Sequence, residues 1–357
     1  MAENQKEKYL EEIEDQIRTI GVLTSGGDAP GMNAAIRAVV RTALSRGLKV
    51  RGIRRGFHGL LKEEIIDLSA RDVSEKIQRG GTFLQTARCK SMRTEEGQQK
   101  AAAICKKYGI DGLVVIGGDG SFAGAQKLAN LGVNTIGIPG TIDNDMGYTD
   151  FTIGFDTAVN NVMNEIYKIR DTMRAHDRVG VIEVMGRRCG DIALWAGVAG
   201  AADIILVPER PLSWADAANR LAANKLRGQL TSIVMIAEGA GKAEDFCEYV
   251  RKYTDVEIKA TVLGYIQRGG NPSAFDRVLA AKMGQRAVEL LADEANMRGT
   301  DRAGSRAAEN NDLRENFGYA VGIRENRIIS VPLAEAVSTR DCFDDKLYDL
   351  NSVMAKF

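Results

Sequence analysis

The stretch from Gly117 to Asp145 constrains this chain more than any other part of the sequence. It contains two glycine-bounded acidic turns, Gly117–Ser121 (GGDGS) and Pro139–Asp145 (PGTIDND). Short apolar runs precede the turns, Leu113–Ile116 and Thr135–Ile138, with the length and β-branched content of buried parallel strands. Ligands of open α/β sheets gather at the carboxyl ends of such strands. Three carboxylates delivered there, with glycines that permit close backbone approach, predict a metal–phosphate site.

Composition supports a globular α/β protein and excludes a general polyanion binder. The 357 residues suffice for one large or two ordinary domains, and 44% are hydrophobic against 27% charged. Lys plus Arg and Asp plus Glu number 48 each, so the net charge is zero. A phosphate site in this chain must therefore come from local clustering of cations rather than from a basic surface.

The cysteines and the first residues predict a cytoplasmic protein. The five cysteines are scattered and have no zinc-ligand spacing, which favours a reducing compartment. No apolar stretch approaches transmembrane length. Met1–Arg18 is charged and rich in Glu, so it is expected to be a helical arm or a frayed extension rather than a targeting signal.

A second glycine turn lies near the start of the chain. The strand pattern Thr19–Leu23 leads to Gly26-Gly27, and Ala34–Arg46 follows with helical spacing of apolar residues. A strand, a double-glycine turn and a helix form a phosphate-binding arrangement, because backbone N–H groups and the helix dipole favour an anion. The segment matches neither GxGxxG nor Walker A, and a simple tight turn is the alternative.

The rest of the chain continues the α/β alternation. Further strands are expected at Lys49–Ile53, Arg178–Val184, Asp203–Val207 and Ser232–Ala237, helices at Gly97–Tyr108, Phe122–Leu131, Thr157–Ala175 and Ile192–Ala201, and a turn at Gly56–Gly59. The Ala and Gly content of the last helix predicts a close neighbour. Met297–Asn316 is predicted to be an exposed loop or a partly disordered insertion. Arginines recur in loops after strands, which favours phosphate binding over a merely solvated face: Arg88, Arg178, Arg187 and Arg268.

Five motifs in order give the chain a specific family resemblance. They are TSGGDAPGMNAAIR, GGDGS, PGTIDND, VMGRRCGD and LGYIQRGG, and each alone would be weak. Together they resemble the bacterial-type 6-phosphofructokinase family from about Ile20 to Asp341. The resemblance implies an α/β fold of two Rossmann-like three-layer domains with mainly parallel sheets and an active site in the interdomain cleft.

The resemblance also implies domain limits and an oligomer. Residues 17–154 with 267–337 would form the larger, ATP-binding domain, and 155–266 with 338–357 the smaller, sugar-phosphate-binding domain. Residues 1–16 would be an N-terminal helical extension. A homotetramer is expected, with the sugar-phosphate site shared between subunits.

The implied reaction is phosphorylation of D-fructose 6-phosphate by ATP at the C1 hydroxyl, giving fructose 1,6-bisphosphate in glycolysis. Asp143 matches the family's general base, and capping a helix or holding a metal is its alternative role. Thr141, Arg187 and the backbone at Gly27 would stabilise the transferring phosphoryl group. Asp119 and Asp145 would hold Mg²⁺, directly or through water.

The binding residues divide between the two substrates. The nucleotide set is Gly27, Arg88, Cys89, Arg93, Gly118, Asp119, Gly120, Ser121 and Gly124. The sugar-phosphate set is Thr141, Asp143, Asp145, Arg178, Met185, Gly186, Arg187, Glu238, Lys259, Tyr265 and Arg268. Two members depart from the family, which usually has arginine at Lys259 and histidine at Tyr265. The lysine loses the bidentate fork and the tyrosine is never a cation near neutral pH, so a weaker sugar-phosphate site is expected.

Two small residues favour ATP as the donor. Pyrophosphate-dependent members of the family tend to have Asp and Lys where this chain has Gly120 and Gly140. An aspartate there would crowd and repel the α-phosphate region of a nucleotide, and a lysine could replace charge that ATP contacts supply. Three alternatives remain: a pyrophosphate-dependent enzyme, a kinase for a related sugar phosphate, and a catalytically weak regulatory subunit.

The resemblance extends less securely to regulation. An ADP or phosphoenolpyruvate effector would bind through Arg37, Arg41, Arg170 and Arg227, with Asp203 where an acidic metal ligand is usual. Ala70 and Gln229 stand where well-regulated members have basic residues. Altered or weakened regulation is expected, with ordinary interface salt bridges as the alternative role of the arginines.

Overall fold

The computed structural model describes residues 17–229, 231–297, 318–339 and 343–355. Contacts divide the chain into two compact units. Unit 1 takes its described residues from Met1–Thr141, Tyr148–Ile153 and Asn271–Thr339, and unit 2 from Ile142–Gly147, Gly154–Gly270 and Arg340–Phe357. The expected extension at 1–16 and residues 298–316 of the expected insertion lie outside the described residues. The domain limits implied by the resemblance stay a prediction.

Unit 1 is built on a seven-stranded, mainly parallel sheet with the order β11-β10-β5-β4-β1-β2-β3. Its strands are β1 (Thr19–Ser25), β2 (Lys49–Ile53), β3 (Ile65–Asp67), β4 (Gly112–Gly117), β5 (Asn134–Pro139), β10 (Gly318–Arg324) and β11 (Arg327–Pro332). Only the edge strands β3 and β11 pair antiparallel with their neighbours. The parallel α/β fold expected from the sequence is confirmed for this unit.

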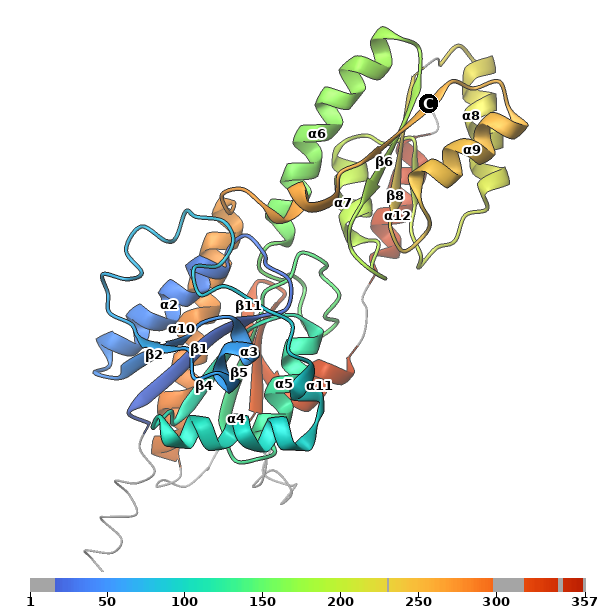
Figure 1. Cartoon of the computed structure of the whole chain (residues 1–357). Coiled ribbons are helices and arrows are strands. Elements are labelled where there is room, and N and C mark those ends of the chain that lie inside the picture. Colours follow the sequence, from blue (N-terminus) through green and yellow to red (C-terminus); the bar gives the residue numbers. More distant parts are fainter. Residues whose placement is uncertain (1–16, 230, 298–317, 340–342, 356–357) are drawn as a thin grey trace, which may run out of the picture. The chain divides into compact units, whose positions relative to one another are not determined.

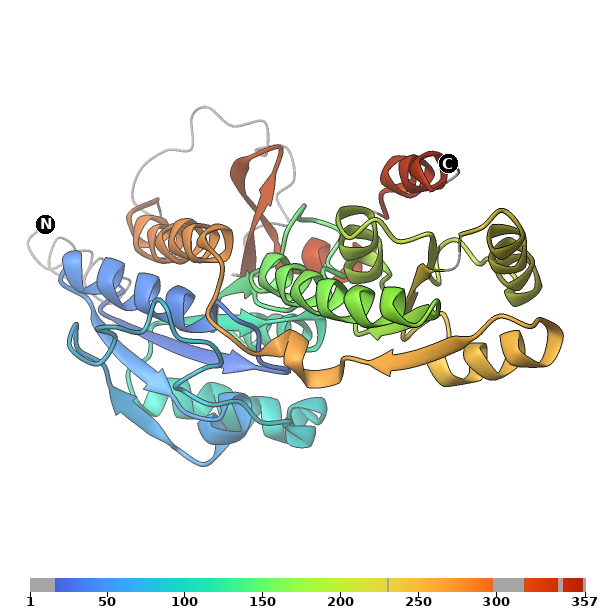
Figure 2. The same cartoon turned by 90° about the horizontal axis from the view of Figure 1, so that it is seen from above.

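Helices cover both faces of this sheet. They are α2 (Met32–Ser45), α3 (Gly56–Leu61), α4 (Glu95–Lys107), α5 (Asp119–Ala129), α10 (Ala274–Met297) and α11 (Leu333–Ser338), with a short 3₁₀ turn η1 (Lys90–Arg93). Helices α2 and α10 lie side by side on one face, and α4 and α5 lie on the other (Figures 1 and 2). Because both faces are covered, every residue of β1 and β4 is buried, which is why β4 has a continuous apolar sequence.

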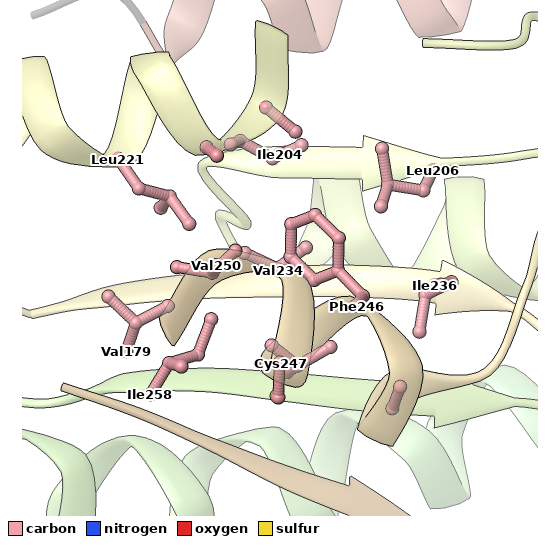
Figure 3. Close-up of a cluster of buried hydrophobic side chains, with 14 of the residues drawn as sticks. Val179, Ile204, Leu206, Leu221, Val234, Ile236, Phe246, Cys247, Val250 and Ile258 are labelled. Atoms are coloured by element: carbon pink, nitrogen blue, oxygen red, sulfur yellow. The ribbon is translucent and has the colours of Figure 1, made fainter. Parts of the chain in front are cut away.

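Unit 2 has a smaller sheet of four parallel strands in the order β7-β8-β6-β9. The strands are β6 (Val179–Val184), β7 (Ile204–Leu206), β8 (Ser232–Ala237) and β9 (Ile258–Val262), and the helices are α6 (Phe155–Ala175), α7 (Asp191–Ala199), α8 (Trp214–Leu226), α9 (Ala243–Tyr253) and α12 (Asp345–Met354), with the 3₁₀ turn η2 (Gly264–Arg268). Figure 3 shows side chains of α8 and α9 packed on this sheet around Phe246 and Val234, both fully buried. This second parallel sheet confirms the expected two-sheet architecture.

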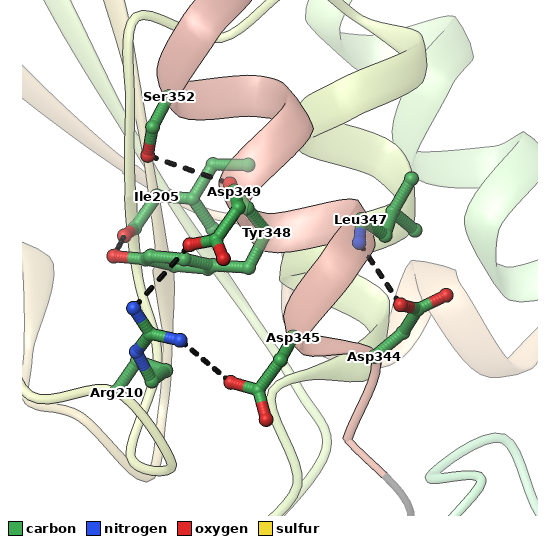
Figure 4. A network of polar contacts seen from close by, with 8 residues as sticks. All are labelled: Ile205, Arg210, Asp344, Asp345, Leu347, Tyr348, Asp349 and Ser352. Atoms are coloured by element: carbon green, nitrogen blue, oxygen red, sulfur yellow. Dashed lines mark hydrogen bonds and ion pairs between the residues drawn. The ribbon is translucent and has the colours of Figure 1, made fainter.

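The last helix is fastened to unit 2 by polar contacts as well as by packing. Arg210 pairs with Asp345 at 2.7 Å and with Asp349 at 3.3 Å, and its guanidinium lies 5.2 Å from the ring centroid of Tyr348 (Figure 4). Asp344 caps the helix by accepting the N–H of Leu347 at 2.9 Å. The first turn of α12 is therefore held to the loop that carries Arg210.

Several local predictions can be compared with the structure. The strands predicted at Lys49–Ile53 and Ser232–Ala237 are confirmed to the residue. The turn predicted at Gly56–Gly59 is wrong, because this segment begins the short helix α3. The close neighbour predicted for the Ala- and Gly-rich helix is confirmed, since a Cβ on Gly197 would lie 2.6 Å from a side-chain carbon of Ile205. Of the helices in the described residues, none is long and apolar enough to cross a membrane.

Candidate active site

The strand order of unit 1 predicts where a ligand would bind along the edge of its sheet. From β1 the chain continues to β2 and β3 on one side, whereas β4 and β5 lie on the other side. The order therefore reverses between β1 and β4, and ligands of open α/β sheets bind outside the carboxyl ends of strands at such a point. Gly26-Gly27 follows β1 there, and Gly118-Asp119-Gly120 follows β4.

The two glycine turns lie against one another. Gly26 has φ = 88°, a left-handed conformation that favours glycine, and a Cβ added to it would lie 3.3 Å from Oγ of Ser121. Gly118 is the N-cap of α5, so Asp119 and Gly120 belong to the first helical turn and not to a free loop as the sequence suggested. Gly27 is exposed beside this helix start. Exposed backbone and a helix N-terminus together suit an anion such as a phosphate.

A third turn, after β5, joins the same edge. The N–H of Gly140 donates to the carbonyl of Gly117 at 3.0 Å, and the side chain of Thr141 lies 3.5 Å from the position that a Cβ of Gly118 would take. The Thr141 carbonyl accepts the buried hydroxyl of Thr152 at 2.6 Å. These contacts fix Thr141 beside the N-cap of α5.

Three glycines that the sequence assigned to the donor site differ in what surrounds them. A Cβ on Gly120 would meet no atom within 4 Å. A Cβ on Gly140 would lie 3.0 Å from Ile116 Cγ2 and 3.3 Å from Met32 Cε, and one on Gly124 would lie 2.9 Å from the ring of Phe57. Packing therefore accounts for Gly140 and Gly124, whereas neither packing nor backbone conformation requires a glycine at position 120.

The basic loop predicted to reach the donor precedes and enters η1. Arg88 and Arg93 are exposed and Cys89 is partly exposed. The segment before Arg88 is tied by hydrogen bonds to the glycine turn after β1, since the hydroxyl of Thr86 donates to the carbonyl of Gly26 at 2.8 Å.

Unit 2 contains a buried carboxylate surrounded by arginines. Asp143 has a side chain only 1% exposed, and its oxygens lie 3.2 Å from Nε of Arg187 and 3.9 Å from an Nη of Arg268. An Nη of Arg187 lies 4.0 Å from Asp145, whose side chain is 23% exposed. A buried charge is tolerated only where it is paired, so the two guanidinium groups compensate the burial of Asp143. The sequence-predicted residues Asp143, Asp145, Arg187 and Arg268 are thus brought together.

Backbone hydrogen bonds orient the arginine that contacts Asp143. Arg187 has φ = 56° in the turn after β6, a conformation that is uncommon for residues other than glycine. Its N–H donates to Glu238 at 2.7 Å, and the N–H of Met185 donates to the side chain of Gln267 at 3.1 Å. The N–H of Gly190 donates to Glu209 at 2.7 Å. Three side chains from separate segments therefore hold the turn in its strained shape.

Sequence reasoning named Glu238 as a sugar contact but missed Gln267. Gln267 is fully buried, and besides accepting the Met185 N–H it donates to the Gly264 carbonyl at 3.0 Å. It links the turn that carries Arg187 to η2, which carries Arg268. The one sequence signal was an uncharged amide directly before that arginine in the motif IQRGG.

Two of the predicted phosphate cations lie at the amino-terminal ends of strands in the unit 2 sheet. Arg178 precedes β6 and pairs with Glu257 at 2.6 Å, and the exposed Lys259 lies near the start of β9. Arg187 and Arg268 instead come after the carboxyl ends of these strands. Because a six-residue strand such as β6 is about 20 Å long, the two ends of the strands lie about 20 Å apart. Tyr265 in η2 is 83% exposed. Within one chain, Arg178 and Lys259 are thus not brought to Asp143.

The residues predicted for an effector are divided between the units. Arg37 and Arg41 belong to α2 of unit 1. In unit 2, Asp203 accepts from the Gln229 amide at 2.5 Å and from the Ile233 N–H at 2.7 Å. Arg170 donates to the carbonyls of Gly200 and Ala201, and Arg227 to Asn224 at 2.6 Å. A cavity of about 400 Å³ between β7, α8 and α12 is lined by Asp203, Arg220, Arg227, Tyr348 and Ser352, among others.

The described residues contain no cluster of three or more His, Cys, Asp or Glu side chains that could hold a metal ion. Mg²⁺ at phosphoryl-transfer sites is commonly held by one or two carboxylates together with substrate phosphates and water. The carboxylate oxygens of Asp119 and Asp145 are ligands of the kind that Mg²⁺ takes.

Two mainly parallel sheets with glycine turns at one switch point, and a buried carboxylate between arginines, define an α/β protein equipped for phosphate chemistry. The phosphofructokinase family model matches residues 19–291, and the chain belongs to the phosphofructokinase family. The chain is 51% identical over 340 residues to the ATP-dependent 6-phosphofructokinase of Clostridium botulinum strain Hall, covering 95% of this chain and 100% of that protein. It is 53% identical over 339 residues to the enzyme of the same name from Clostridium tetani, with the same coverage.

The fold agrees with this membership. A solved structure of phosphofructokinase from Saccharomyces cerevisiae superposes with a TM-score of 0.78 at 35% identity, covering 90% of this chain. The chain spans only 45% of that yeast chain, whereas it spans the whole length of the two bacterial relatives.

Proposed function

We propose that this protein is an ATP-dependent 6-phosphofructokinase, which transfers the γ-phosphoryl group of ATP to the C1 hydroxyl of fructose 6-phosphate. The observation that carries the proposal is the buried Asp143 on its TIDND segment, held 3.2 Å from Arg187 and 3.9 Å from Arg268. The near full-length similarity to proteins named for this activity supports it. The products are ADP and fructose 1,6-bisphosphate, and the reaction belongs to glycolysis.

Asp143 is the general base in this proposal. A carboxylate accepts the proton of the C1 hydroxyl as the hydroxyl oxygen attacks the γ-phosphorus of ATP. Arg187 compensates the carboxylate in the resting chain and is a flexible, half-exposed cation that can turn to the transferring group. Thr141 and the backbone of Gly27 donate hydrogen bonds to the same group, which concentrates donors where negative charge develops.

The donor is bound by unit 1 in this proposal. The glycine turns after β1 and β4 present backbone N–H groups to the phosphates, and Arg88 neutralises their charge, with Cys89, Arg93, Ser121 and Gly124 in the same region. Asp119 and Asp145 would hold Mg²⁺. The ion neutralises phosphate charge when bound with ATP. The open space at Gly120 supports a nucleotide donor over pyrophosphate, since nothing in the fold explains a glycine there.

In this proposal the acceptor is bound by cations from both ends of the strands in the unit 2 sheet. Arg268 and Glu238 act beside Asp143, with Met185 and Gly186 in the adjoining turn. Arg178 and Lys259 bind the 6-phosphate of a neighbouring subunit's site, which explains why they lie away from Asp143 in their own chain. A shared site of this kind requires an oligomer, and we propose a homotetramer in the cytoplasm.

Effector control is altered in this proposal. Both oxygens of Asp203 accept hydrogen bonds, one from the Gln229 amide and one from the Ile233 N–H, and such an engaged carboxylate is a poor metal ligand. ADP or phosphoenolpyruvate would bind through Arg37, Arg41, Arg170 and Arg227, with weaker effect than in a site with basic residues at Ala70 and Gln229.

A coupled assay of product formation tests the function. Purified protein with Mg²⁺ is given ATP or pyrophosphate and, in turn, fructose 6-phosphate, tagatose 6-phosphate and sedoheptulose 7-phosphate. We expect turnover with ATP and fructose 6-phosphate, and a fall in kcat of about 10²- to 10⁴-fold for Asp143→Asn. Asp67→Asn, at a side chain 88% exposed, is the matched control and keeps its activity. Turnover only with pyrophosphate, only with another sugar phosphate, or with none of them contradicts the proposal.

A further inference from the structure

The segment that carries Arg88 has no regular secondary structure to fix it. Between the end of β3 at Asp67 and the start of η1 at Lys90 there is no helix or strand. Connections longer than about 12–15 residues without such structure are uncommon in compact domains and are usually functional. Leu68, Val73 and Leu84 are buried and anchor the segment by packing, so its polar contacts decide how its last part lies.

One buried side chain of α2 makes three hydrogen bonds to the backbone of this segment. Nδ2 of Asn33 donates to the carbonyls of Arg79 at 3.1 Å and Gly80 at 3.0 Å, and Oδ1 accepts the N–H of Phe83 at 2.8 Å. The orientation of the amide is determined, because carbonyls only accept and an N–H only donates. Asn33 is 2% exposed, so water does not replace these partners readily.

A second set of hydrogen bonds joins the same segment to the glycine turn. The fully buried hydroxyl of Thr24 lies 2.9 Å from the hydroxyl of Thr82 and donates to the carbonyl of Gln85 at 2.9 Å. The Thr86 hydroxyl donates to the carbonyl of Gly26 at 2.8 Å. Residues 79–86 are thus fastened to the end of β1, the glycine turn and the start of α2, all within unit 1.

We propose that Asn33 is a positioning residue for the phosphoryl donor, because it fixes the loop that ends at Arg88 relative to Gly26-Gly27. This inference rests on the proposed function, in which Gly27 and Arg88 bind the phosphates of ATP. Arg88 lies two residues beyond Thr86, so a shift of residues 79–86 moves its guanidinium away from the glycine turn. A small misplacement of a binding group is enough to weaken a phosphate contact.

The variant Asn33→Ser tests this role, with Asn134→Ser as its matched control. Asn134 also donates its amide to a backbone carbonyl in unit 1, that of Asp111 at 3.0 Å, but it begins β5 and lies at the edge opposite the glycine turns. For Asn33→Ser we expect a rise of about tenfold in the KM for ATP, with the KM for fructose 6-phosphate changed less than about twofold. Amide hydrogen exchange should quicken at Phe83, and Asn134→Ser should leave both KM values and this exchange unchanged.

The outcomes separate this inference from the function on which it rests. If the wild-type protein does not phosphorylate fructose 6-phosphate from ATP, the proposed function fails, and exchange at Phe83 still reports whether Asn33 holds the loop. If the wild type is active and Asn33→Ser lowers only kcat or thermal stability, Asn33 is merely structural and the inference is overturned. Should Asn33→Ser not fold, Thr86→Val removes one tie at a partly exposed position. An unchanged KM for ATP in that variant also counts against the inference.

Discussion

Replacing Gly120 by aspartate should raise the free energy of unfolding and at the same time weaken the binding of ATP. A Cβ at position 120 meets no atom within 4 Å, and the residue is the second of α5. Aspartate is less unfavourable than glycine in a helix by about 0.3 kcal/mol, and an acidic side chain in a first helical turn gains about 0.3–1 kcal/mol from the helix dipole. The free energy of unfolding should therefore rise by about 1 kcal/mol.

The same aspartate should weaken ATP binding, because its negative charge repels the phosphates. Two like charges 4 Å apart repel by about 1 kcal/mol in water and by about 4 kcal/mol at an effective dielectric constant of 20. Because 1.4 kcal/mol is a factor of ten, we expect the KM for ATP to rise at least about fivefold. Gly120→Asn adds nearly the same volume without the charge, so it isolates the electrostatic part. The difference in the KM for ATP between Gly120→Asp and Gly120→Asn should also become smaller as the salt concentration rises.

Urea unfolding at fixed protein concentration and steady-state kinetics with varied ATP supply the two measurements. Gly140→Ala is the contrasting variant, because its Cβ would press on Ile116 at 3.0 Å in a fully buried strand. We expect it to lower the free energy of unfolding by about 1–3 kcal/mol. Equal KM values for Gly120→Asp and Gly120→Asn, or a loss of stability in Gly120→Asp, would refute the reasoning.

Three further predictions concern other parts of the chain. Burial raises the pKa of the Cys105 thiol to about 12, so at pH 8 only about one part in ten thousand is thiolate. A thiol reagent should therefore label the partly exposed Cys89 and leave Cys105 unmodified until the protein unfolds, which peptide mapping can check. Gln267→Leu leaves the Met185 N–H without its acceptor and should cost about 1–3 kcal/mol of stability together with kcat, measured by urea unfolding and the coupled assay. Arg210→Ala removes two exposed ion pairs to α12 and should lower the melting temperature only slightly, a change that thermal unfolding measures and that high salt should reduce.

The sequence predicted the sheets of this protein better than its turns. Central strands such as β4 and β8 are buried on both faces, so their apolar runs identified them within a residue. The segment Gly56–Gly59, which has a glycine at each end, was wrongly expected to be a turn. Gly59 is instead packed against the carbonyl of Arg54 inside a short helix, a close approach that only the tertiary structure defines.

The candidate site was predicted through its motifs, whereas the reasons for individual residues needed coordinates. Gly120 and Gly140 looked equivalent in the sequence, since each stands beside a turn residue with a proposed role. Their surroundings separate them, because only Gly140 has neighbours that a Cβ would press. The glycine without a packing reason is therefore the stronger evidence for a nucleotide donor.

Two buried amide residues that hold the site loops in place, Asn33 and Gln267, were not predicted from the sequence. Asn33 and Gln267 carry no charge and belong to no metal or nucleophile pattern, and the only sequence signal was the position of Gln267 directly before Arg268. Each is buried at 2% exposure or less and uses its amide to hold the backbone of a loop that carries an arginine. A flexible cation can bind a phosphate with a defined geometry only if its backbone is fixed. In this chain buried amides supply that constraint, one for the loop before Arg88 and one for the turn before Arg187.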